Sequence, residues 1–257
     1  MMMLKKLEPL ELGGGRVAAM DAASWRLTLP AGLQKYADAQ LDDYRFLPRA
    51  RFPWAPPLHF SLRARRPTGD ICGTYGFGLW NDPFAFSLGL GGAARRLPAS
   101  PNCAWFFYGS PPHDLELTPG VPGWGWKAQV LRSPPLPGVL LLPAAAVALA
   151  LARNSLLRSP VIRSGRAITA CAETVIQTTD AGWHTYRMDW DRNGLTFSVD
   201  DAAVLETEIT PRPPLGFVVW LDNQYAVFSP RKGFRFGILP TPAMAQLDVA
   251  DLVVIGE

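Results

Sequence analysis

The chain has 257 residues, of which 48% are hydrophobic and 18% are charged, and its formal net charge is +3. This composition is that of a globular protein and excludes a disordered chain. A chain of this length can bury about 70–75% of its unfolded surface, so it needs no disulfide bonds to hold a core. Most of the basic residues are arginines, but they are scattered along the chain. We therefore expect no nucleic-acid partner.

The three cysteines, Cys72, Cys103 and Cys171, show neither paired spacing nor a C-x-x-C pattern. They are expected to be free, buried thiols, and we predict no metal site and no cofactor. Residues 1–15 contain no apolar segment as long as a signal peptide needs. We therefore predict a cytoplasmic protein.

Residues 1–24 are expected to be an irregular lead-in to a single domain that spans residues 25–257. Alternating apolar and polar residues then predict strands at Trp25–Leu29 and Leu58–Arg65. Tyr36–Tyr44 is more polar and is predicted to be an edge strand. Its carboxylates are expected to be solvated: Asp38, Asp42 and Asp43.

Two stretches of the chain combine aromatic strands with polar turns. Thr74–Phe86 is an apolar strand that runs into the turn Trp80-Asn81-Asp82-Pro83, and Cys103–Asp114 is an aromatic strand that ends at a Pro-Pro turn. If these strands are neighbours in one sheet, they line one aromatic surface. A glycine-rich loop is expected at 89–92, and a second loop, 119–127, carries Trp124 and Trp126.

The most apolar stretch is Gly138–Ala152, which is too short to span a membrane and is interrupted by Pro143. Proline suits the first turn of a helix, so one inserted apolar helix is expected around residues 143–157. Packing on the outside of the domain is the favoured interpretation. A lid over a ligand site, or contact of 138–152 with a membrane surface or a partner, is the alternative.

The last third of the chain returns to short strands separated by turns. These strands are expected at 167–178, 183–190, 195–199, 204–209, 215–223, 233–238 and 247–255. At least ten strands with one helix predict an all-β, two-sheet antiparallel sandwich.

The segment Trp183-His184-Thr185-Tyr186-Arg187-Met188-Asp189-Trp190, with the hairpin strand 195–201 after it, resembles the concanavalin A-like lectin and glucanase superfamily. It is most similar to glycoside hydrolase family 16, which carries a W-H-x-Y-x-x-x-W strand before such a hairpin. Gly76–Trp80 and Leu247–Val254 resemble two further strands of that family, in the same order. The resemblance implies a β-jelly roll with a concave sheet crossed by a cleft.

Glycosidase chemistry is not expected from this chain. The family carries its catalytic carboxylates on one strand, as E-x-D-x-x-E or E-x-D-x-E, and neither pattern occurs here. A retaining mechanism needs two carboxyl groups about 5–5.5 Å apart. The strand that corresponds, Ala104–Gly109, has no carboxylate, and the nearest acids are Asp114 and Glu116 beyond the Pro-Pro turn. We therefore leave the catalytic residues unassigned.

Candidate ligand-binding residues are the aromatic and polar side chains that would lie around such a cleft. They are Trp80, Asn81, Trp105, Phe107, Tyr108, His113, Asp114, Trp124, Trp126, Trp220, Asp222 and Asn223. Alternation places Trp105 and Phe107 on one face of their strand and Phe106 and Tyr108 on the other, and either pair could face the cleft. The adjoining His113 and Asp114 could supply acid–base chemistry, with a hydrogen-bonded loop as the favoured alternative.

Two functional classes fit these features. The first is a non-hydrolytic binding protein for a carbohydrate or an apolar small molecule. The second is an enzyme of isomerase, cyclase or lyase type that acts on an apolar small molecule in the same cleft. A third hypothesis is a degenerate family 16 glycosidase. An open groove with stacked aromatic rings favours sugar binding, and a closed apolar pocket favours an enzyme.

Overall fold

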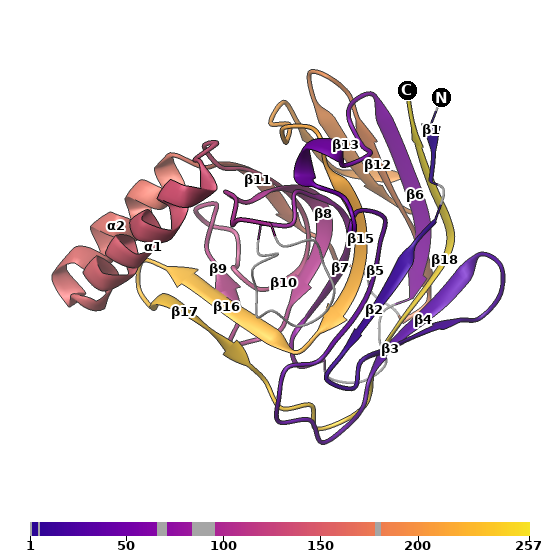
Figure 1. The fold of residues 1–257 in the computed structure, drawn as a ribbon, viewed down its shortest axis with the longest axis horizontal. Helices are drawn as coiled ribbons and strands as arrows, with labels where there is room; N and C mark the ends of the chain where they lie inside the picture. Colours follow the sequence, from indigo (N-terminus) through magenta and orange to yellow (C-terminus); the bar gives the residue numbers. More distant parts are fainter. Residues whose placement is uncertain (1, 5, 66–70, 84–95, 178–180) are drawn as a thin grey trace.

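The computed structural model describes all residues except 1, 5, 66–70, 84–95 and 178–180. The described chain forms two large antiparallel sheets packed face to face, with a small third sheet and a helical hairpin beside them (Figure 1). This confirms the predicted fold class, an all-β, two-sheet antiparallel jelly-roll sandwich. The predicted glycine-rich loop at 89–92 and the end of the segment Thr74–Phe86 lie outside the described residues.

The eight-stranded sheet is called sheet A. Its strands follow the order β14 (Ala202–Thr207), β13 (Leu195–Val199), β12 (Trp183–Trp190), β6 (Leu58–Arg65), β18 (Ala245–Gly256), β4 (Ser24–Leu29) and β3 (Arg16–Ala19), and β1 (Met2–Met3) also pairs with β18. The bounds of β6 are the ones that the alternation in Leu58–Arg65 predicted, and every second side chain of the strand lies in the core.

The seven-stranded sheet is called sheet B. Its order is β11 (Ala170–Val175), β10 (Gly125–Arg132), β8 (Asn102–Gly109), β7 (Thr74–Trp80), β15 (Gly216–Asp222), β5 (Asp38–Asp42) and β2 (Glu8–Leu12). The two aromatic strands, β7 and β8, are neighbours, which meets the condition for one shared aromatic surface. The third sheet joins β17 (Gly233–Ile238), β16 (Gln224–Ser229) and β9 (Asp114–Leu115), and a short 3₁₀ helix covers Arg49–Arg51.

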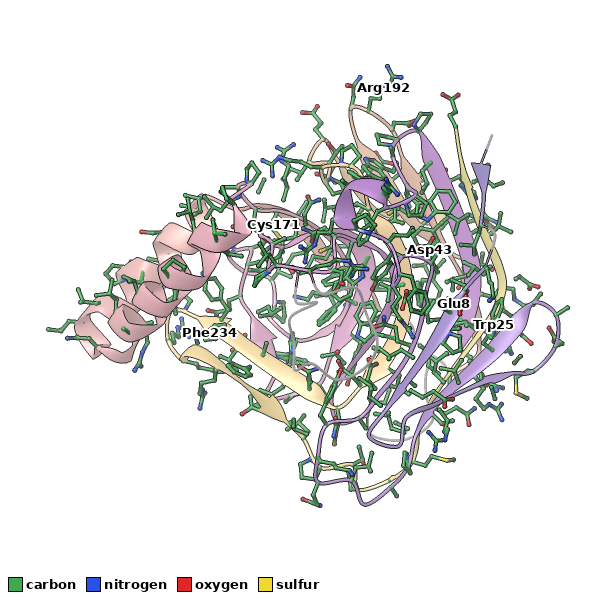
Figure 2. All side chains as sticks on the ribbon, in the orientation of Figure 1. Glu8, Trp25, Asp43, Cys171, Arg192 and Phe234 are labelled. Carbon is green, nitrogen blue, oxygen red and sulfur yellow. The ribbon has the colours of Figure 1, made fainter. Side chains whose placement is uncertain are left out.

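The region 1–24, expected to be an irregular lead-in, contains three strands among its described residues: Met2–Met3, Glu8–Leu12 and Arg16–Ala19. A turn at Gly13 and Gly14, both with positive φ, sends β2 to the edge of sheet B and β3 to the edge of sheet A. β5 is consequently covered by β2 and is not an edge strand. Glu8 lies opposite Asp42 in the register of the two strands, in the region where Figure 2 labels Glu8 and Asp43. The carboxylates of β5 are buried and not solvated, with Asp38 only 4% exposed.

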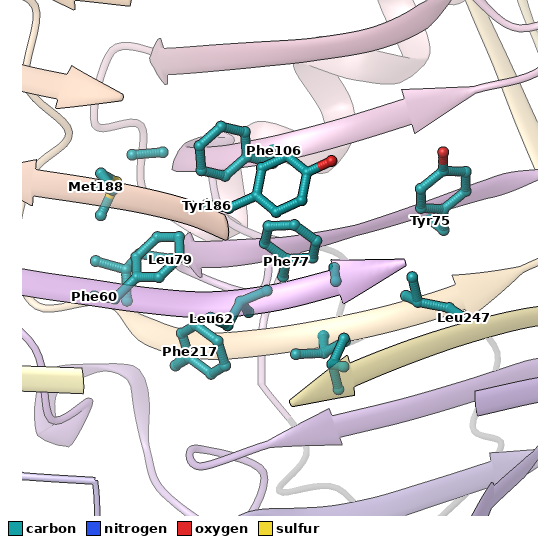
Figure 3. Close-up of a cluster of buried hydrophobic side chains, with 14 of the residues drawn as sticks. Phe60, Leu62, Tyr75, Phe77, Leu79, Phe106, Tyr186, Met188, Phe217 and Leu247 are labelled. Atoms are coloured by element: carbon teal, nitrogen blue, oxygen red, sulfur yellow. The ribbon is translucent and has the colours of Figure 1, made fainter. Parts of the chain in front are cut away.

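The core fills the space between the sheets and is largely aromatic (Figure 3). Phe106 of β8 is fully buried there, and its ring centroid lies 5.0 Å from that of Tyr186 and 5.2 Å from that of Phe197. This decides the orientation of β8. Phe106 and Tyr108 face the core, so Trp105 and Phe107 lie on the other face of sheet B, which is called the outer face.

The single helix expected around residues 143–157 is replaced by two helices: α1 (Gly138–Arg153), which contains the apolar segment, and α2 (Ser155–Ala167). Asn154 separates them because it has an extended ψ of 125°, and its side-chain Oδ1 accepts a hydrogen bond from the Leu156 N–H, which caps α2. Pro143 therefore lies inside α1 and not in its first turn. No helix among the described residues is long and apolar enough to cross a membrane.

Candidate functional site

Four aromatic rings form a continuous layer on the outer face of sheet B. They belong to Trp80, Trp105, Phe107 and Trp220 and are called the aromatic platform. The ring centroid of Trp105 lies 5.9 Å from Trp80, 5.5 Å from Phe107 and 5.2 Å from Trp220. Trp80 and Trp105 are half-buried, whereas Phe107 and Trp220 are 6% and 8% exposed. The rings of Trp80 and Trp105 are therefore the parts of the platform most open to a ligand.

Two glycines of β7 let the indole rings lie close to the sheet. A Cβ at Gly76 would come within 2.6 Å of the Trp220 ring, and a Cβ at Gly78 would come within 2.7 Å of the Trp105 side chain. A side chain at Gly76 would collide with the Trp220 ring, and one at Gly78 would collide with the backbone and Cβ of Trp105. The sequence Thr-Tyr-Gly-Phe-Gly-Leu-Trp thus builds the platform by leaving space on the outer face.

Each indole N–H of the platform has a partner that fixes the ring. Trp80 Nε1 donates to the Tyr44 hydroxyl at 2.5 Å, Trp105 Nε1 donates to Gln129 Oε1 at 2.8 Å, and Trp220 Nε1 donates to Thr74 Oγ1 at 3.0 Å. Buried indole groups usually find such partners, and here the partners come from other segments of the chain. The platform is therefore held in one conformation before any ligand arrives.

A buried ion pair supports the platform on the side of β10 and β11. Lys127 Nζ donates to Glu173 Oε2 at 2.8 Å and to the Pro122 carbonyl at 2.9 Å, and both charged side chains are 0% exposed. Gln129 Nε2 donates to the same Glu173 oxygen at 2.8 Å. Because Gln129 also accepts from Trp105, the charged pair orients the amide that holds the indole.

Two carboxyl groups meet on the side of β5 and β15. Asp38 and Asp222 are directly opposite each other in the register of these strands and share the outer face with Trp220. Asp222 Oδ1 accepts from Thr74 Oγ1 at 2.8 Å, whereas Asp38 Oδ1 has no hydrogen-bond partner among the described residues. Burial, reinforced by the charge of Asp222, holds the pKa of Asp38 well above its usual range. Burial also raises the pKa of Asp222 to about 6, against the hydrogen bond from Thr74.

The predicted His113–Asp114 pair does not act together. His113 is 3% exposed, its Nδ1 accepts from the Ala226 N–H at 3.2 Å, and its ring lies 5.1 Å from Phe107. Burial, with the nearby charge of Lys127, lowers the pKa of His113 to about 4, so the ring is neutral at pH 7. The Asp114 carboxylate instead pairs with Lys232 Nζ at 2.6 Å. This arrangement is the hydrogen-bonded loop that the sequence favoured.

The remaining candidate residues lie away from the platform. Tyr108 and Trp126 face the core, where their rings stack on Tyr75 at 4.7 and 5.1 Å. Trp124 is 51% exposed in the loop before β10. Asn81 and Asn223 bridge backbone groups: Asn223 is fully buried, accepts from the Ala37 N–H and donates to the carbonyls of residues 35 and 239. Of the twelve candidates, the outer face brings together Trp80, Trp105, Phe107, Trp220 and Asp222, and His113 packs against Phe107.

Two surface hollows of about 340 and 280 Å³ lie elsewhere on the described chain. The first is lined by residues around Pro57, Arg192 and Glu257, and the second by residues around Leu7, Trp25 and Val253. Neither is lined by a residue of the platform. Among the described residues, no three side chains of His, Cys, Asp or Glu gather as a metal site would require.

No family model matches this chain, and no curated protein matches it. Solved structures with a similar arrangement include a family 16 glycoside hydrolase of Bacteroides ovatus that acts on mixed-linkage glucan, with 11% identity over 97% of this chain and 94% of that one and a TM-score of 0.48. A β-glucanase of Bacillus licheniformis has 10% identity over 98% and 92% of the two chains, with a TM-score of 0.45. A pseudo β-1,3-glucanase of Mycobacterium tuberculosis has 12% identity over 91% and 75%, with a TM-score of 0.46. These values are too low to transfer an activity to this chain.

Sequence reasoning missed the polar groups that hold the platform. The Asp38 carboxylate was expected to be exposed to solvent. The list of candidate ligand-binding residues did not include Lys127, Gln129 or Glu173. Lys127 and Gln129 alternate on β10 and could have been read as one polar face of a strand. No pattern in the neighbouring sequence indicates that Asp38 lies opposite Asp222, because the two residues are on strands that are far apart in the sequence.

Proposed function

We propose that the chain binds a carbohydrate on the aromatic platform and does not hydrolyse it. The observation that carries this proposal is the fixed orientation of the three indoles, each hydrogen-bonded through its N–H. Sugar rings stack on flat aromatic faces, and a platform ordered in advance loses little conformational entropy on binding. The half-buried rings of Trp80 and Trp105 offer the open surface for stacking.

Polar groups beside the platform support a sugar more than an apolar ligand. Gln40 and the Asp222 carboxyl are half-buried on the same outer face, next to Trp220. Hydroxyl groups of a sugar can donate further hydrogen bonds to such oxygens, whereas an apolar ligand would cover these polar groups without adding any. The combination of aromatic rings and hydrogen-bond acceptors therefore favours a ligand that has both a flat apolar ring face and hydroxyl groups, as a sugar does.

The composition of β8 supports the proposed lack of hydrolysis. The side chains that this strand presents on the outer face include Trp105 and Phe107, and the strand has no carboxylate. Glycoside hydrolysis needs an acid and a nucleophile or base on opposite sides of the scissile bond. An indole and a phenyl ring can stack on a sugar but supply neither group.

The test is calorimetric titration of the purified chain with β-glucan oligosaccharides, compared with Trp105→Ala and Trp183→Ala. Trp183 is 37% exposed on the outer face of sheet A and serves as the matched control. We expect the Trp105 variant to lose about tenfold or more in affinity, since stacking of one ring contributes about 1.5 kcal/mol, and the Trp183 variant to bind normally. Equal affinities in all three proteins would reject the platform as the site.

The Asp38–Asp222 pair supports a second candidate, an enzyme that uses a protonated carboxyl as an acid. Two carboxyls that face each other with raised pKa values are typical of acid–base sites. The same oligosaccharides should therefore be assayed for reducing-sugar release and for other changes in mass. We expect none. A product whose formation is abolished by Asp222→Asn would replace the binding proposal with this one.

A further inference from the structure

The helical hairpin carries exposed apolar side chains that no described part of the chain covers. α1 packs on α2 and contacts β17. The hairpin nevertheless projects away from the sandwich (Figure 1). Val147 and Leu151, one turn apart on α1, are 58% and 41% exposed. A helix that is apolar on all sides is normally buried in a core or in lipid. The free side of α1 therefore needs a covering that the described sandwich does not provide.

The end of the hairpin farthest from the sandwich is also apolar. The chain leaves sheet B through α1, turns at Asn154 and returns through α2, so the turn forms the tip. Leu156 and Leu157 directly follow this turn and are 82% and 42% exposed. Two leucines at a projecting tip cannot be explained by packing within the chain.

The third sheet extends this apolar surface beside the helices. Phe234 and Phe236 are two residues apart on β17 and so lie on the same face of the strand. They are 39% and 73% exposed, and their ring centroids lie 6.0 Å apart. Phe234 lies next to the helices at the edge of the molecule (Figure 2). We call this set of side chains the hairpin surface: Val147, Leu151, Leu156, Leu157, Phe234 and Phe236.

The charged residues of the two helices and of β17 are all arginines, and the Asp114 carboxylate of the third sheet pairs with Lys232. The sequence contains no Asp or Glu between Glu116 and Glu173, whereas α2 alone carries three arginines. Arg163 and Arg235 are exposed, and neither forms an ion pair within the described residues. Arg166 Nε donates to the Leu117 carbonyl at 3.3 Å, which leaves its charge without a carboxylate there. The surface is thus apolar with a cationic border.

We propose that the hairpin surface docks on an anionic lipid bilayer. Apolar side chains beside Lys or Arg are the composition of segments that lie in the membrane interface, with the apolar groups in the acyl boundary and the cations at the headgroups. The 16 residues of α1 are about 24 Å long, shorter than the roughly 30 Å hydrocarbon core, so the hairpin lies in the interface and does not span it. A second copy of the chain would place like charges together, which disfavours self-association.

The test is flotation of the full chain with vesicles of phosphatidylcholine, with and without about 30% phosphatidylserine. We expect binding to the anionic vesicles, weakened by salt, and little binding to the neutral ones. The variant Leu156→Glu/Leu157→Glu should lower the partition coefficient at least about tenfold, because two apolar side chains no longer leave water. Arg163→Glu should lower it by a smaller factor.

The matched control is Met20→Glu, which changes a 53% exposed apolar residue far from the hairpin in the sequence and should bind like the parent. All substituted residues are exposed, and thermal unfolding checks that the variants fold. Three results would overturn the proposal: no binding to anionic vesicles, binding that the double variant leaves unchanged, or a lipid-free dimer in light scattering that the double variant dissociates.

Discussion

The outer faces of the two large sheets differ in how deeply they bury their ion pairs. On sheet A, pairs such as His59–Asp189 at 2.7 Å and Arg63–Asp251 at 3.3 Å are exposed to solvent. On sheet B, the Lys127–Glu173 pair is fully buried. Burying charges costs several kcal/mol for each ion, and apolar residues of similar volume would often be as stable. Sheet A buries the Asp248 carboxylate, but its partners Arg26 and Arg65 stay about a third exposed. The place of the fully buried Lys127–Glu173 pair beside the aromatic platform therefore indicates a role in positioning the platform.

The largest effect is expected from breaking the buried pair. Lys127→Met should lower the free energy of unfolding by about 3–5 kcal/mol, because it leaves the Glu173 charge buried without its cation. Urea unfolding measures this change. The double variant Lys127→Met/Glu173→Met should recover part of the loss. A single variant within about 0.5 kcal/mol of the parent would contradict the buried-charge interpretation.

A smaller loss of stability is expected when a side chain is added at Gly76, between the backbone of sheet B and the Trp220 ring. Gly76→Ala should cost about 2–3 kcal/mol, because the new Cβ would lie 2.2 Å from the Phe106 carbonyl oxygen and 2.6 Å from the Trp220 ring. Gly165→Ala is the matched control in α2, where the closest contact is 3.2 Å with the tip of the Phe228 ring. It should be neutral or stabilising by up to about 1 kcal/mol, since Ala favours helix. Equal unfolding midpoints for both variants would refute the steric account.

The acidic pair should make stability depend on pH. The pKa of Asp222 is about 6 in the folded chain and near 3.8 when unfolded, so its contribution is fully present below pH 3.8 and is lost as the pH rises through 6. Asp222→Asn should therefore stabilise the chain by about 1–2 kcal/mol near pH 8, with the gain disappearing near pH 4. Urea unfolding at both pH values checks this. A gain that is the same at both values would argue against the raised pKa.

The smallest change in the free energy of unfolding is expected from a substitution on the outer face of sheet A. Arg63→Ala removes one partner of an exposed ion pair and should change the free energy of unfolding by about 0.5 kcal/mol or less. The same urea assay applies, and moderate salt should abolish the difference. A loss as large as that of Lys127→Met would erase the contrast between the two faces.

The sequence predicted those parts of the fold that have a local pattern. Leu58–Arg65 and Trp183–Trp190 alternate cleanly, and both strands have the predicted bounds. The aromatic composition of 103–109 identified a strand but not its core face, because Trp, Phe and Tyr occur on both sides. The N-terminal strands were missed since Pro9 and a glycine turn hid them. The break at Asn154 was missed because a helix-capping side chain was read as part of one helix.

The candidate site was less accessible from the sequence. Trp80, Trp105, Phe107 and Trp220 were named, but nothing local separated them from Trp126, whose strand alternation turns it to the core. The buried Lys127–Glu173 pair and the Asp38–Asp222 pair depend on strand order and register. Those features follow from packing of the whole sandwich and not from the neighbours of each residue.

The most direct test of the platform is an NMR titration that follows the indole N–H signals of the nine tryptophans. β-Glucan oligosaccharide should shift the signals of Trp80, Trp105 and Trp220 together, while the signal of Trp183 on sheet A and that of buried Trp190 stay in place. Saturable shifts confined to the first three would agree with binding on the outer face of sheet B. Shifts confined to Trp183 or Trp124, or no shifts with any oligosaccharide, would contradict it.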